Sequence, residues 1–117
     1  MILNTLFIFA AALAPLTIAQ SNNVTITGYV GTSCMGEEEY TAVATTDCQN
    51  AKDTIGDETE SLDIEGTFAP GFALYLYGDD ACADFISSEG KGGVCYLPDL
   101  EQYPDGPLSY KLVDTTA

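Results

Sequence analysis

The chain has 117 residues, with 18 acidic side chains, three lysines, no arginine, no histidine and a net charge of −15. Such a charge repels phosphate backbones and anionic lipid headgroups, so nucleic-acid binding and electrostatic docking on membranes are not expected. Because histidine is missing, Ser-His-Asp and Cys-His catalysis and imidazole metal ligation are excluded.

Residues 1–19 are predicted to be a cleaved signal peptide. This stretch has an apolar core and no acidic residue, and it places Thr17 and Ala19 three and one positions before the expected cut. Its uninterrupted apolar run is shorter than the roughly 20 residues that a membrane-spanning helix needs. We therefore expect a secreted, extracellular monomer in which residues 20–117 form a single domain without a membrane span.

Four cysteines follow the predicted signal peptide, at positions 34, 48, 82 and 95. An even number of cysteines in a short secreted chain predicts two disulfides. Thiol catalysis and zinc binding are not expected, because the cysteines are oxidised and lack the close Cys-x-x-Cys pairs of zinc sites.

A shift of 48 residues superimposes one part of the chain on another. The shift aligns Tyr29 with Tyr77, Cys34 with Cys82, Asp57 with Asp105 and Ser61 with Ser109, and it brings Cys48 within one residue of Cys95. A period that occurs only twice predicts two stacked supersecondary units rather than a solenoid. We call residues 24–66 unit one and residues 72–114 unit two.

Both units contain stretches with β-branched or alternating character, which predict strands. The expected strands are 24–29, 40–45 and 61–65 in unit one, and 72–77, 84–87 and 109–113 in unit two. In the closing strand of unit one, Leu62 and Ile64 alternate with Asp63 and Glu65, which is typical of a sheet with one dry face. Two such sheets must pack together, so we expect an all-β antiparallel β-sandwich, with a helical turn within residues 47–55.

Repeat symmetry favours disulfides within the units, Cys34 with Cys48 and Cys82 with Cys95. This pairing keeps the two copies equivalent, whereas the alternatives tie the units together. Each such disulfide should contribute on the order of 3 kcal/mol by restricting the unfolded chain.

The first hairpin of each unit resembles the Greek-key motif of βγ-crystallins, in the small secreted form found in microbes and of fungal type. That motif has an aromatic residue, four further residues, an aromatic residue or cysteine, one residue and then glycine. In unit one, Tyr29, Cys34 and Gly36 match this pattern. The resemblance implies a two-motif Greek-key sandwich, and a positive φ at the glycine, over which the tyrosine ring lies.

Unit two departs from the motif at one position. It keeps Tyr77 and Cys82 but has Asp84 in place of glycine, and aspartate tolerates a positive φ better than most residues. The resemblance also implies that a serine opening the last strand, Ser61 or Ser109, ties that strand back to the hairpin.

Members of the family bind Ca2+ through two consecutive Asn or Asp, two variable residues, Ser or Thr, and Ser. The corresponding segments 56–61 and 104–109 keep Asp57 and Asp105 but lack the first acidic residue and the penultimate hydroxyl. Because Ca2+ needs several oxygen ligands, we expect no bound cofactor. Asp57 and Asp105 are weak Ca2+ candidates and fit better as turn residues.

Other side chains offer weaker signals. The carboxylates at 37–39 and at 79, 80 and 84 are expected to be solvated, since glycosidase chemistry needs two carboxyls set apart across a cleft; no catalytic residue and no enzymatic function are expected. Tyrosines at 75, 77, 96, 103 and 110 would suit a sugar or peptide surface, but their positions favour packing. Asn23, in Asn23-Val24-Thr25, is an N-glycosylation acceptor.

The family resemblance implies a binding or toxin-type module, since small secreted microbial members include killer-toxin-like proteins and protease inhibitors. Such an effector would act on an extracellular protein or a cell-surface target. The loops 35–47 and 83–94, each closed by its own predicted disulfide, are the candidate inhibitory loops. The alternative is a structural or cell-wall-associated protein, with or without Ca2+ binding.

Overall fold

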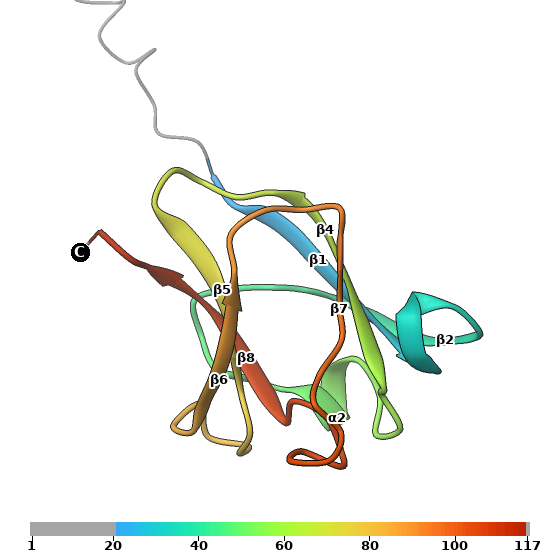
Figure 1. Cartoon of the computed structure of the whole chain (residues 1–117). Helices are drawn as coiled ribbons and strands as arrows, with labels where there is room; N and C mark the ends of the chain where they lie inside the picture. The colour runs from blue at the N-terminus through green and yellow to red at the C-terminus, as the bar shows by residue number, and fades with distance from the viewer. Residues whose placement is uncertain (1–20, 117) are drawn as a thin grey trace, which may run out of the picture.

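The computed structural model describes residues 21–116, and the predicted signal peptide lies outside these described residues. Two four-stranded antiparallel sheets make up the fold (Figure 1), in the orders β2-β1-β4-β7 and β3-β8-β5-β6. The strands are β1 (Asn23–Val30), β2 (Glu37–Val43), β3 (Gln49–Asn50), β4 (Ser61–Thr67), β5 (Phe72–Tyr77), β6 (Phe85–Glu89), β7 (Val94–Tyr96) and β8 (Ser109–Asp114). A 3-10 turn, η2 (Thr32–Cys34), and one helical turn, α2 (Ala51–Thr54), complete the described elements. The predicted all-β class is confirmed.

The two units exchange their third strands. β3 of unit one pairs with β8 of unit two, where Gln49 lies opposite Tyr110. In the same way β7 of unit two pairs with β4 of unit one, where Tyr96 lies opposite Leu62 (Figure 1). Each sheet therefore contains three strands of one unit and an edge strand from the other. The sequence pattern predicts neither β3 nor β7, because two or three residues are too few to show a period.

The hydrophobic core lies between the two sheets. It is built from alternate residues of the central strands: Val24, Ile26, Leu62 and Ile64 from the first sheet, and Leu74, Leu76, Tyr110 and Leu112 from the second, each at most 3% exposed. The intervening Glu65 is exposed, as the alternation predicts. The Tyr110 hydroxyl forms a 2.7 Å hydrogen bond with Thr54 Oγ1, which ties α2 to this core.

Both disulfides form, but they pair differently from the prediction. The bonds join Cys34 to Cys95 and Cys48 to Cys82, so each connects the first cysteine of one unit to the second cysteine of the other. The expected pairs within each unit, Cys34 with Cys48 and Cys82 with Cys95, are wrong.

The strand exchange is the physical reason for this pairing. Cys95 lies in β7 and Cys48 directly precedes β3, so each exchanged strand carries its cysteine to the opposite sheet. There it meets Cys34 or Cys82 of the other unit, with Cα–Cα distances of 6.0 and 5.9 Å. Exchanging the units converts one bond into the other, so repeat symmetry is satisfied by this pairing as well.

The longer disulfide loops raise the expected stabilisation. The sequence separations are 61 and 34 residues, and loop-closure entropy over such lengths gives about 4 kcal/mol for each bond. The disulfides close these loops across both units, so they constrain the whole described fold rather than one hairpin.

Digestion without reduction tests the pairing. Cleavage after Lys52 and Lys91 separates Cys34 and Cys48 from Cys82, and Cys82 from Cys95. We expect the three pieces that contain cysteine to remain in one linked species, whereas disulfides within units would release the piece ending at Lys52. A further cut after Glu39 should leave two linked pairs of peptides, joined by Cys34–Cys95 and by Cys48–Cys82. Detection of any other linked pair by mass spectrometry would contradict this disulfide pairing.

Candidate functional site

In unit one, a buried serine organises the turn that carries the first cysteine. Ser61 opens β4, and its Oγ accepts the Cys34 N–H at 2.8 Å and donates to the Gly31 carbonyl at 2.6 Å. The hydroxyl therefore satisfies both a donor and an acceptor of the 31–36 turn. Gly36, which ends this turn, has a φ of 100°, a conformation that favours glycine.

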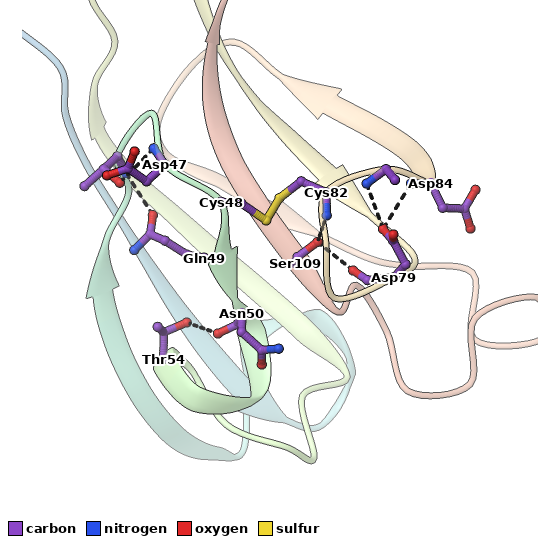
Figure 2. Close-up of a disulfide and its surroundings, with 11 residues drawn as sticks. Asp47, Cys48, Gln49, Asn50, Thr54, Asp79, Cys82, Asp84 and Ser109 are labelled. Carbon is purple, nitrogen blue, oxygen red and sulfur yellow. Dashed lines mark hydrogen bonds between the residues drawn. A yellow bond between two sulfur atoms is a disulfide. The ribbon is translucent and has the colours of Figure 1, made fainter.

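Unit two repeats this arrangement. Ser109 Oγ accepts the Cys82 N–H at 3.0 Å and donates to the Asp79 carbonyl at 2.6 Å (Figure 2). Asp79 aligns with Gly31, and Cys82 has a φ of 53°, close to the 54° of Cys34. The two turns thus present their cysteines to the exchanged strands in the same backbone conformation.

Asp84 does not adopt the positive φ expected at the glycine position. Among the described non-glycine residues, positive φ occurs at Ser33, Cys34 and Cys82. Instead, the Asp79 carboxylate accepts the N–H groups of Ala83 and Asp84, each at 3.0 Å (Figure 2). These hydrogen bonds, led by that from Asp84, hold the pKa of Asp79 below its ordinary value. The Asp79 side chain therefore stabilises the turn of unit two, whereas in unit one the positive φ of Gly36 allows the turn. Asp79 was missed as a structural residue, although the repeat alignment places it opposite Gly31.

One carboxylate of the run 37–39 has a structural role rather than a solvated one. Glu39 Oε1 accepts the Thr59 hydroxyl at 2.8 Å, and Glu39 Oε2 accepts the Glu58 N–H at 3.4 Å. Strand β2 is thereby tied to the segment that leads into β4.

Asp57 and Asp105 come together at one end of the molecule. Both line a cavity of about 250 Å3, together with Ala51, Lys52, Gly56, Pro107 and Leu108. They also line a neighbouring hollow of about 350 Å3. Within residues 21–116, no group of three or more His, Cys, Asp or Glu side chains is arranged to hold a metal ion.

The two expected inhibitory loops are not closed by disulfides of their own. Residues 35–47 consist mainly of β2, and residues 83–94 contain β6. Because Cys34 and Cys82 bond to the other unit's cysteines, neither segment is a small cyclic loop, and this part of the prediction is wrong.

The tyrosines at 75, 77, 96, 103 and 110 do not share one surface, since Tyr96 belongs to β7 of the first sheet and Tyr103 lies between β7 and β8. Tyr110 is fully buried and Tyr77 is only 6% exposed. Tyr75 and Tyr77 alternate with the core residues Leu74 and Leu76 of β5, so they lie toward the outer face of the second sheet, where Tyr75 is half-buried. Their rings form a cluster with Phe85, which is 52% exposed, with centroid distances of 5.0 to 6.4 Å. Lys111 Nζ lies 5.9 Å from the Tyr77 ring centroid. We call Tyr75, Tyr77, Phe85 and Lys111 the aromatic face.

The outer face of the first sheet has the opposite character at equivalent positions. By strand register, five positions on the outer face of the first sheet correspond to five on the second. Thr27, Tyr29, Glu38, Asp63 and Glu65 correspond in that order to Tyr75, Tyr77, Phe85, Lys111 and Val113. Burial raises the pKa of Tyr29, and the nearby carboxylates of Glu38, Asp63 and Glu65 raise it further. Only the tyrosine of the hairpin is common to both faces, so the fold itself does not require the aromatic face.

The chain matches no known family model, no curated protein and no solved structure. Within the described residues, no helix is long and apolar enough to cross a membrane.

Replacing either buried serine by alanine should destabilise the protein. Ser61→Ala and Ser109→Ala each leave a partly buried N–H and a carbonyl without their partner, which costs about 1–3 kcal/mol. Urea unfolding with the disulfides intact measures this loss. The exposed Ser88→Ala is the control, and equal stability of all three variants would contradict a role for the hydroxyls.

Asp79 should make stability depend on acid pH. Since its folded pKa is lowered, it stabilises the fold above the unfolded pKa, and this contribution is lost as the pH falls through the folded pKa. Asp79→Asn should therefore flatten the acid limb of the stability curve, measured by urea unfolding below about pH 4. The neighbouring Asp80→Asn removes a charge without these hydrogen bonds, and an equal flattening there would assign the effect to net charge.

Proposed function

We propose that this chain is a secreted Greek-key β-sandwich of the βγ-crystallin type that acts by binding a protein outside the cell, without catalysis. Three features support the fold assignment: the exchange of third strands, the serine that bridges each hairpin turn, and the tyrosine before each turn. The disulfides support the extracellular setting, because such bonds persist in oxidising compartments.

The observation that carries the binding function is the difference between the two outer faces. Both units have apolar core strands and a serine that bridges the turn, yet the second sheet has Tyr75, Phe85 and Lys111 where the first has Thr27, Glu38 and Asp63. Tyrosine and other aromatic residues are enriched at the centres of protein interfaces, where charged residues are depleted. Three of the four residues of the aromatic face are aromatic, and Lys111 is its one charged residue.

Charge favours a basic protein surface with an apolar centre as the partner. The chain carries a net charge of −15, which steers a basic partner toward it. Carboxylates border the aromatic face. Burial raises the pKa of the Tyr77 phenol, and the nearby Tyr75 and Asp79 raise it further. Asp84 directly precedes Phe85. Such an arrangement, apolar in the middle and acidic at the border, complements a basic surface around an apolar patch.

Repeat-swap variants test this function, because each introduces a residue that the other unit already tolerates. Tyr75→Thr and Phe85→Glu copy Thr27 and Glu38 of the first sheet. Labelled protein should bind saturably to intact cells that display its partner, and each variant should lose at least tenfold in affinity, about 1.4 kcal/mol. Binding should also weaken as salt rises.

The matched control is Tyr40→Ser. Tyr40 is 68% exposed but belongs to β2 of the first sheet, and Ser87 occupies the corresponding position of unit two. This variant should bind as well as the unchanged protein. Absence of saturable binding would refute the binding function, while equal losses in all three variants would refute the aromatic face as its location.

A further inference from the structure

The first strand begins with a glycosylation acceptor whose asparagine is exposed. Asn23 is the first residue of β1, and it is followed by Val24, which is not proline, and by Thr25. Oligosaccharide transfer requires Asn-x-Thr or Asn-x-Ser in which x is any residue except proline. The chemical requirement of the motif is therefore met at an exposed position.

The strand geometry directs this asparagine away from the core. Val24 and Ile26 are completely buried, so the alternating residues Asn23 and Thr25 lie on the outer face of the first sheet. Strand β2 extends only as far as Val43, opposite Thr25. On the other side, Asn23 is paired with Thr67, which is exposed. A sugar attached at Asn23 would thus extend into solvent without disturbing the core.

The repeat shows that the fold does not require these residues. In unit two the positions that correspond to Asn23 and Thr25 are occupied by Gly71 and Ala73. Strand β5 still forms, beginning one residue later at Phe72, and it pairs with β8 in the same register. The asparagine and the threonine therefore need an explanation other than strand formation.

The other two described asparagines have structural roles, in contrast to Asn23. Asn22 Oδ1 accepts the Ala69 N–H at 2.8 Å, which fixes the segment before β5. Asn50 Oδ1 accepts the Asp53 N–H at 3.3 Å and caps α2. Neither is followed by serine or threonine two positions later.

We propose that Asn23 carries an N-linked glycan. Its side-chain Nδ2 forms a bond to C1 of the first sugar of a lipid-linked oligosaccharide, the bond from C1 to the lipid diphosphate breaks, and the amide loses one proton. The products are the glycosylated chain and the free lipid diphosphate, with no oxidation or reduction. The reaction occurs in the lumen of the secretory pathway, so the proposal depends on secretion but not on any binding partner.

A glycan at this position would distinguish the two outer faces further. It would stand over the threonine-rich and acidic surface of the first sheet, beside Thr25 and Thr67, and would leave the second sheet uncovered. Proteins would be kept from approaching the first sheet, because a hydrated oligosaccharide is bulky and solubilising.

The test is expression in a eukaryotic host behind a secretion signal of proven function, which ensures entry into the lumen. The secreted protein should have a larger mass than its sequence predicts, and peptide N-glycosidase should remove the excess and convert Asn23 to aspartate. Asn23→Gln and Thr25→Val should abolish the added mass, whereas Thr25→Ser should retain it.

The threonine pair separates loss of the acceptor from loss of folding. Thr25→Val keeps Asn23 and places a good strand former at an outward position, so the variant should still be secreted with both disulfides. Secreted protein with unmodified Asn23, or added mass that persists in both Asn23→Gln and Thr25→Val, would overturn the proposal.

Discussion

The exchange of the third strands is the constraint on which the rest of the structure depends. β3 and β7 are so short that neither adds much to a sheet by itself, yet each brings a cysteine to the opposite unit. The disulfides then fix the exchange covalently, and they do so across 34 and 61 residues, where restricting the unfolded chain is most effective. Neither unit can open as a separate module while both bonds remain, so the two units stabilise one shared core.

The turn before the first cysteine of each unit holds that cysteine in position for its disulfide. Ser61 and Ser109 each hold a cysteine N–H and the carbonyl three residues earlier, and both cysteines have a left-handed backbone conformation. Such a conformation is costly for a residue with a side chain, and buried hydrogen bonds offset that cost. Unit two lacks the glycine at the end of the turn and uses the Asp79 carboxylate in its place. The same geometry is thus reached by backbone freedom in one copy and by side-chain hydrogen bonds in the other.

The sequence predicts the long strands well because they carry the core, and alternation at Leu62 and Ile64 or the apolar run 72–77 is a direct consequence of burial on one face. It does not predict β3 and β7, since their two or three residues take their place from pairing partners distant in the sequence. The disulfide error has the same origin. Repeat symmetry does not discriminate, because all three possible pairings satisfy it, and only the crossing of the third strands decides among them. The aromatic face could not be predicted from the sequence either, because a tyrosine in a strand can lie on either face of the sheet until the register is known.

An internal repeat supplies a comparison that a single sequence otherwise lacks. Some positions are similar in both units because each unit packs in the same way, and these include the bridging serines and the alternating core residues. Positions that the fold leaves free have diverged, and the divergence is organised: carboxylates and threonines gather on the first sheet, and Tyr75, Phe85 and Lys111 on the second. Their segregation is expected if one face contacts a partner while the other, with its acceptor at Asn23, is kept hydrated and free of contacts.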